Sequence, residues 1–176
     1  MNRAKLAVLG VIVVVVGAFA SGALFRMHQA AQGIVMQFGD PKRVIQEPGL
    51  NFKIPFIQNV VIYDKRILNL DPPAQEMQLA DKERIVVDAF ARYKITDPLK
   101  FFQSVRTESA FRDVFGRNLN SGVRNELGLH NLTLLLSPER QGIMDKIQER
   151  LNVAAKNFGI TVVDIRIVRT DLPQEI

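Results

Sequence analysis

The chain has 176 residues, a formal net charge of +5, no cysteine and only two histidines. This composition excludes disulfides and cysteine nucleophiles, and it leaves too few ligands for a zinc or iron centre. Lys and Arg are spread along the chain in pairs rather than gathered in one basic block, which argues against a nucleic-acid partner. The length suits one compact domain or two small ones.

The first predicted element is a transmembrane helix from Leu6 to Phe25, a run without a charged residue. It is long enough to cross the hydrocarbon core of a bilayer, and its apolar side chains favour insertion by roughly 4 to 7 kcal/mol. Arg3 and Lys5 precede the run and only Arg26 follows closely, so the charge bias places residues 1–5 in the cytoplasm. The lipid-facing positions expected in this span include Leu6, Val11, Val14, Phe19 and Phe25.

A cleaved signal peptide is the alternative interpretation of the same residues, because the small-residue triplet Ala18-Phe19-Ala20 resembles a cleavage site. The apolar run continues beyond such a cut as far as Phe25, which a removed signal does not require. The sequence therefore favours an anchor, and in either case it predicts that the remaining chain is exported.

Short extended segments alternate with turn formers from Gly33 to Ile95, which predicts an antiparallel strand meander. The clearest strand is 85–95, where every second residue is apolar or aromatic and the residues between are mostly charged. This period predicts one buried face and one face in water. The other predicted strands are 33–38, 44–45, 50–54, 60–63 and 66–70, and Pro72-Pro73 closes the series.

Two amphipathic helices are predicted after Asp97-Pro98. The first has an apolar residue at every fourth position from Phe111 to Leu127, with Thr107 as N-cap and Gly128 at its end. The second takes Ser137 as N-cap, has Pro138 at its first position and ends before Gly159, with an apolar face of Ile143, Ile147, Leu151, Ala154 and Phe158. A last strand over 160–168 returns to the sheet, and this order of elements predicts an α+β domain.

Residues suited to catalysis do not form a known catalytic pattern in this sequence. It contains no Gly-rich phosphate loop, nucleophile elbow or spaced set of metal ligands. Asp81, Glu83, Asp88 and Asp97 fit solvated or capping roles better than acid–base catalysis, and His130 fits a surface or capping role in a helix connection. We therefore expect no catalytic, cofactor-binding or metal-binding residues, and a protein that is not an enzyme.

One apolar segment, 48–57, is broken by prolines and follows the predicted span closely. Its apolar side chains either pack into the core, which their chemistry alone slightly favours, or enter the lipid leaflet beside the span. Lys53 would reach lipid headgroups in the second case. The candidate membrane-contact residues of this segment are Phe52, Ile54, Pro55, Phe56 and Ile57.

Several motifs, together and in order, resemble the SPFH or band 7 family, to which stomatins, prohibitins and flotillins belong. The match runs from the predicted span to the end of the chain. Within the family, its later motifs are similar to a bacterial subunit that modulates the membrane protease FtsH. The motifs are Gln32-Gly33-Ile34-Val35 with Phe38-Gly39, Pro48-Gly49-Leu50 with Phe52-Lys53-Ile54-Pro55-Phe56, Tyr63-Asp64-Lys65-Arg66, Leu70-Asp71-Pro72-Pro73-Ala74-Gln75-Glu76, Val87-Asp88-Ala89-Phe90-Ala91-Arg92-Tyr93 and Asp97-Pro98-Leu99-Lys100-Phe101.

The resemblance implies a single-pass protein of the bacterial inner membrane with a periplasmic domain. It divides the chain into the anchor 6–25, a membrane-apposed β-rich part 26–96 and a helical part 97–176, and it favours lipid contact for the candidate residues of segment 48–57. A long helix continues the family pattern, and this chain stops before it at Ile176.

The partners implied by the resemblance are an HflK-like subunit and an FtsH-type membrane protease. Many copies of the two subunits would form a hetero-oligomeric enclosure that regulates access to the protease, without enzymatic activity of their own. The alternatives are a general stomatin-like organiser of membrane lipid domains and, from another class, a protease in its own right.

Overall fold

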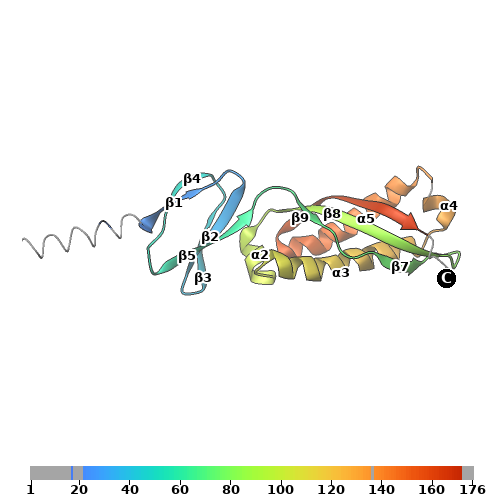
Figure 1. Cartoon of the computed structure of the whole chain (residues 1–176), viewed down its shortest axis with the longest axis horizontal. Helices are drawn as coiled ribbons and strands as arrows, with labels where there is room; N and C mark the ends of the chain where they lie inside the picture. Colours follow the sequence, from blue (N-terminus) through green and yellow to red (C-terminus); the bar gives the residue numbers. More distant parts are fainter. Residues whose placement is uncertain (1–16, 18–21, 136, 172–176) are drawn as a thin grey trace, which may run out of the picture. The chain divides into compact units, whose positions relative to one another are not determined.

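The computed structural model describes residues 17, 22–135 and 137–171, and the chain divides into two compact units, Met1–Lys65 and Arg66–Ile176 (Figure 1). Most of the predicted span, including Leu6, Val11, Val14 and Phe19, lies outside the described residues. Within the described part of the chain, no helix has the length and apolar character needed to cross a membrane.

Five strands build the first unit. Antiparallel pairing joins three of them into a sheet of order β3-β2-β5 and the other two into a ribbon, β1-β4. The last two residues of the predicted span, Leu24 and Phe25, are part of a strand, and Phe25 packs against a buried cluster of Met27, Val35 and Ile45. The strands are β1 (Leu24–Met27), β2 (Ala31–Gln37), β3 (Asp40–Ile45), β4 (Gly49–Phe52) and β5 (Gln58–Asp64).

The connections of the first unit gather at two ends. At the end nearest residue 22, which we call the proximal end, Lys53 N donates to Ala23 O at 2.7 Å, and the Gln58 side chain bonds to Gln37 Oε1 at 3.2 Å. At the opposite, distal end, Lys65 donates from N to Ala30 O and from Nζ to Gln46 O, both at 2.8 Å. The β2–β3 turn and the β4–β5 loop therefore share the proximal end with the start of β1.

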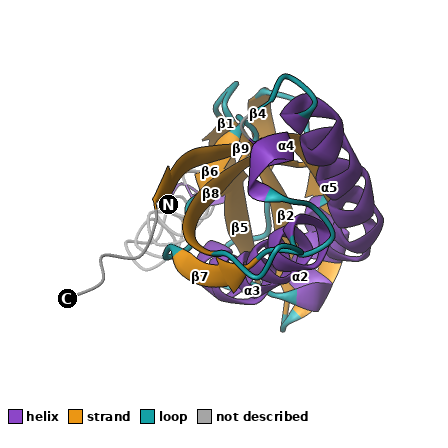
Figure 2. Cartoon of the chain, turned by 90° about the vertical axis from the view of Figure 1, so that its right-hand side faces the viewer, coloured by secondary structure: helices purple, strands orange, loops and turns teal. Residues whose placement is uncertain are grey.

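The second unit is a sheet covered on one face by helices (Figures 1 and 2). Its central strand pairs antiparallel with two short strands along one edge and with one long strand along the other. The strands are β6 (Leu68–Leu70), β7 (Gln75–Gln78), β8 (Arg84–Ile95) and β9 (Ile160–Asp171), and the α-helices are α2 (Pro98–Ser104), α3 (Glu108–Leu127), α4 (Leu132–Leu135) and α5 (Arg140–Ala155). The mixed helix and strand content, the alternating burial of β8 and the return strand are confirmed.

The unit boundary differs from the division expected at residue 96. Strand β8 belongs with the helices, because β9 pairs along most of its length, from Val86 to Ile95, and α3 packs against it. Residues 66–96 therefore join the helical part, and the first unit is restricted to the strands before Arg66.

Helix α3 has the predicted caps, and Thr107 Oγ1 accepts a hydrogen bond from Ala110 N at 3.3 Å. The predicted start of the next helix is wrong, because α5 begins at Arg140. Ser137 Oγ instead donates to Leu134 O at 2.8 Å and accepts from Glu139 N at 3.2 Å, which closes a separate turn. The buried face of α5 includes Ala155 rather than Ala154, and a short 3₁₀ helix, η1 (Lys156–Phe158), follows it.

Aromatic rings form the centre of the second core. The Phe111 ring lies 4.7 Å from that of Tyr93, 5.1 Å from that of Phe115 and 5.4 Å from that of Phe101, measured between centroids. Phe158 approaches Phe111 edge-on at 6.0 Å. The cluster joins α2, α3, η1 and β8, so each element is held by contacts with several others.

Gly159 makes the corner between η1 and β9 with φ of 66°. Its carbonyl accepts from Thr96 N at 3.0 Å and from Asp97 N at 2.8 Å. A Cβ at this position would overlap the Asp97 carbonyl oxygen. Both the backbone conformation and the available space therefore require glycine.

The Gly159→Ala variant should lower the free energy of unfolding by about 1 to 3 kcal/mol, because it adds backbone strain and a steric overlap. Gly142→Ala is the matched control, since this glycine lies in α5 with open space around it. The control should be neutral or stabilising by up to about 1 kcal/mol. Equal melting temperatures of the two variants would contradict this account of the corner.

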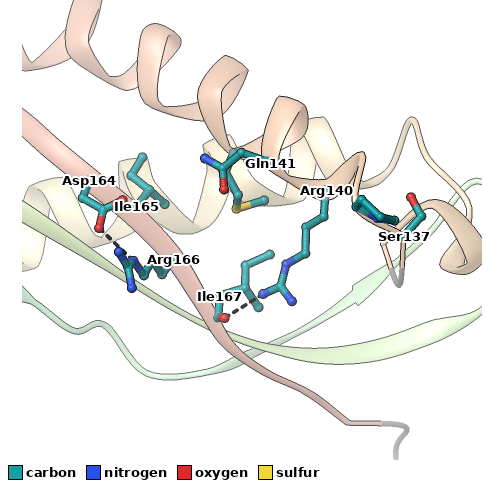
Figure 3. A pocket seen from close by; sticks show the side chains of 9 residues that line it. Ser137, Arg140, Gln141, Asp164, Ile165, Arg166 and Ile167 are labelled. Carbon is teal, nitrogen blue, oxygen red and sulfur yellow. Dashed lines mark hydrogen bonds and ion pairs between the residues drawn. The ribbon is translucent and has the colours of Figure 1, made fainter.

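A row of α5 side chains covers the outer edge of β9, and Figure 3 shows one member of this row, Arg140, bonded to Ile167 O. The Asn152 amide accepts from Val162 N at 2.9 Å and donates to Val162 O at 3.3 Å, Gln148 donates to Val163 O at 3.1 Å, and Arg140 donates to Ile167 O at 2.7 Å. Met144 falls in the same row but has no donor, and the pocket of Figure 3 opens beside it. Pairing by side chains protects an edge that would otherwise be open to another strand.

Asn152→Leu should destabilise the protein by about 1 to 3 kcal/mol, because Val162 N loses its partner and Val162 O keeps only the longer bond from Gln148, at 3.4 Å. Asn125→Leu on the exposed side of α3 is the control, and it should change stability by no more than about 0.5 kcal/mol. Chemical denaturation measures both effects. Equal stability of the two variants would show that this edge contact contributes nothing.

Candidate functional site

Two of the carboxylates considered for chemistry, Asp81 and Asp97, have structural partners in the second unit. Asp97 caps α2 by accepting from Leu99 N at 3.0 Å and Lys100 N at 3.1 Å, which confirms its predicted capping role. Asp81 accepts from Leu132 N at 3.0 Å and Glu83 N at 3.3 Å. In residues 22–135 and 137–171, no group of His, Asp and Glu side chains is placed to hold a metal ion. These carboxylates therefore stabilise loops and a helix terminus.

Glu126 is a buried carboxylate that the sequence analysis did not single out. Its side chain is only 3% exposed, Arg150 Nη1 lies 2.9 Å from its Oε2, and His130 Nε2 lies 3.6 Å from its Oε1. The ion pair with Arg150 joins α3 to α5. His130, which contacts this pair beside the end of α3, fits a structural role better than a catalytic one.

The most unusual surface of the described chain is apolar and lies at the proximal end of the first unit. Phe56 is 89% exposed and Phe38 is 84% exposed, more than any other large apolar side chain described. We call the exposed residues of this surface the apolar end, and they are Leu24, Phe38, Phe52, Ile54, Phe56 and Ile57.

Strand pairing explains why these residues share one end. Gln37 pairs with Gln58, so the turn that carries Phe38 lies next to the loop that carries Phe56. Leu24 pairs with Phe52, and paired residues of an antiparallel ribbon point to the same face. Residues that lie far apart in the sequence, such as Leu24 and Phe52, are thereby brought to one surface.

Sequence reasoning found only part of this surface. It identified Phe52, Ile54, Phe56 and Ile57, and these side chains are exposed rather than packed in the core of the unit. It also named Pro55, but this ring is buried and its Cβ lies against Gly22. Phe38 and Leu24 were missed. Phe38 follows an apolar strand and directly precedes Gly39, a pattern that indicates an aromatic residue at the tip of a turn. Leu24 can be placed on this surface only from the register of β1 with β4.

The two most exposed phenylalanines also have strained backbones. Phe38 has φ of 51° and Phe56 has φ of 66°, in the left-handed region that bulky side chains rarely adopt. This conformation costs roughly 1 to 2 kcal/mol per residue. Their rings recover little of that cost by burial within the unit, because both are exposed. Folding of this unit alone therefore does not explain phenylalanine at either position, and strain of this kind is typical of functional sites.

Comparison with known proteins gives the same family as the sequence motifs. The sequence model described as "SPFH domain / Band 7 family" matches residues 25–176. Protein HflC of Haemophilus influenzae is 27% identical over an alignment of 176 positions that covers 94% of this chain and 60% of that protein. Protein HflC of Buchnera aphidicola is 26% identical over 198 residues, covering 100% of this chain and 63% of the relative.

A third relative is named Modulator of FtsH protease HflC, from Escherichia coli. It is 24% identical over 223 residues, which cover 100% of this chain and 66% of that protein. The chain thus spans about three fifths of the length of the first two of these relatives. The family match includes every described strand of both units, with β1 matched from its second residue, and every described helix from α2 onward. The chain belongs to the SPFH domain / band 7 family.

Proposed function

We propose that the chain is a non-enzymatic membrane scaffold subunit that rests its apolar end in a lipid leaflet and, with an HflK-like partner, regulates an FtsH-type protease. The observation that carries the membrane part is the pair of strained, exposed phenylalanines, Phe38 and Phe56, at one end of the first unit. The anchor is the predicted span, with its amino terminus in the cytoplasm and the SPFH domain in the periplasm.

Lipid contact accounts for the energetics of the apolar end. Burial of one phenylalanine side chain away from water stabilises by about 1.5 to 3 kcal/mol, which is enough to offset the roughly 1 to 2 kcal/mol of left-handed strain. The proximal end is also where the chain arrives from the predicted span, since Lys53 N bonds to Ala23 O. A membrane crossed by that span would therefore lie against this end, which supports contact by all six of its apolar residues.

The proposed link to proteolysis comes from the name of the Escherichia coli relative, which is a modulator of FtsH protease. Structural roles for Asp81, Asp97 and Glu126 in the second unit support a regulator rather than a hydrolase. An oligomeric enclosure built with an HflK-like subunit follows the family resemblance. A lipid-domain organiser without a dedicated protease would use the same apolar end, so only partner capture separates the two.

Lipid contact can be measured with one tryptophan, because the chain contains none. In full-length protein reconstituted into bilayers, Phe38→Trp fluorescence should be strongly quenched by lipids brominated on their acyl chains. Ile62→Trp is the control, since Ile62 is exposed on β5 but lies toward the distal end. Adding Phe56→Asp to the Phe38→Trp reporter should weaken quenching, because a charge at the neighbouring loop resists burial in lipid.

The stability of the same proteins shows whether Phe56→Asp acts through lipid contact or through folding. The melting temperature of the Phe56→Asp protein in mild detergent should stay near that of the parent. Phe115→Ala, which removes a fully buried ring, should cost about 3 to 5 kcal/mol. If Phe56→Asp lowered the stability as much as Phe115→Ala, Phe56 would belong to a folded core. If tryptophan were quenched equally at positions 38 and 62, the apolar end would not be buried in lipid.

Affinity purification of the tagged chain tests the proteolysis part. In mild detergent, from a host that makes HflK-like and FtsH-type proteins, both should be recovered with it. Recovery of lipid without either protein would favour the lipid-domain organiser. Casein cleavage by chain freed of FtsH-type protease, abolished by mutation of one serine or carboxylate, would establish a hydrolase and overturn the proposal.

A further inference from the structure

We propose that Arg26, Lys42 and Arg43 form a basic collar that binds the phosphate groups of anionic phospholipids. The proposal rests on the lipid contact of the apolar end and adds the class of lipid that this end selects. All three side chains are exposed in the first unit. The collar draws on β1 and β3, which are separate in sequence.

Strand register places the backbone of the two collar arginines two residues behind the apolar end. On the ribbon, Leu24 pairs with Phe52 at the proximal end, and Arg26 pairs with Leu50 two residues further along. On the sheet, Gln37 and Asp40 close the β2–β3 turn, and Arg43 pairs with Val35, two residues back along β2. Two residues of a strand span about 7 Å, and Arg43 Nη2 bonds to Phe52 O, so the two arginines lie between the level of Phe52 and about 7 Å behind it.

This height matches the phosphate layer of a membrane. Apolar faces of interfacial elements enter the headgroup and acyl boundary by about 5 to 10 Å. When Phe38, Phe52 and Phe56 occupy that depth, groups about 7 Å behind them meet the phosphates. Arg43 is also held in position, because its Nη2 donates to Phe52 O at 2.7 Å and thereby fixes the guanidinium beside the ribbon.

Most of the positive charge in the described part of the first unit lies toward the proximal end. The collar and Lys53 lie there, whereas Glu47 and Asp64 lie toward the distal end, after β3 and at the end of β5. Asp40 is the carboxylate nearest the collar, and it lies at the proximal turn. Lys65 is also distal, where its Nζ binds Gln46 O. The collar therefore presents net positive charge complementary to an anionic lipid surface.

The test compares two lipid probes in full-length Phe38→Trp protein, in phosphatidylcholine bilayers. Brominated phosphatidylglycerol and brominated phosphatidylcholine are added in turn, and quenching gives their relative association with the surface. Each basic residue near an anionic lipid should contribute about fivefold, so we expect the phosphatidylglycerol preference to be at least about fivefold at low salt. It should fall toward one in 1 M salt, because the charges are exposed.

The Arg26→Gln/Lys42→Gln variant should lose most of this preference while it keeps quenching by phosphatidylcholine and the Arg43 contact. Lys146→Gln/Lys156→Gln, on exposed positions of α5 and η1, makes the same change in net charge and should keep the preference. Equal quenching of the parent by both lipids, or equal loss in both variants, would overturn the collar. Absence of quenching by either lipid would instead contradict the underlying lipid contact.

Discussion

Antiparallel pairing in the first unit decides where its apolar residues lie. Strand β1 leads away from the point where the chain arrives, β2 returns, β3 leads away again, and β4 returns before β5. The β2–β3 turn and the β4–β5 loop must therefore reach the same end as Ala23. The exposed phenylalanines, the collar behind them and the proposed seating in a membrane all depend on this pairing.

The two units solve the problem of exposed surface in different ways. In the second unit, α5 side chains pair with the edge of β9, a glycine fits the η1–β9 corner, and the Phe111 cluster fills the core. In the first unit, two phenylalanines are held at left-handed turns with their rings exposed. These groups of the second unit are thus paired or packed within it, while the first unit keeps two phenylalanine rings exposed in the described chain.

Periodicity predicted the elements that depend on local patterns. The β8 strand and the α3 helix were predicted because their apolar residues repeat with periods of two and nearly four. The start of α5 was mispredicted because Ser137 and Pro138 carry a capping pattern but close a separate turn. Strand β1 was missed because Leu24 and Phe25 continue the apolar run of the predicted span.

The candidate site was predicted only where its residues are adjacent in sequence. Segment 48–57 was recognised from its own composition, whereas Phe38, Leu24 and the collar join it through strand register, which pairs distant residues and is not readable from one segment. Pro55 was included because it shares the segment, but the fold turns its ring inward. The division into units likewise depends on pairing between β8 and β9, far apart in the chain.

A depth measurement from the β2–β3 turn to the residue after β3 tests the central claim most directly. The chain has no cysteine, so single spin labels can be placed by Phe38→Cys, Lys42→Cys and Gln46→Cys in full-length protein in bilayers. The ratio of oxygen accessibility to that of a water-soluble nickel complex reports the depth of each label. We predict that depth decreases from position 38 through 42 to 46; equal access of the nickel complex to all three labels would contradict a proximal end seated in lipid.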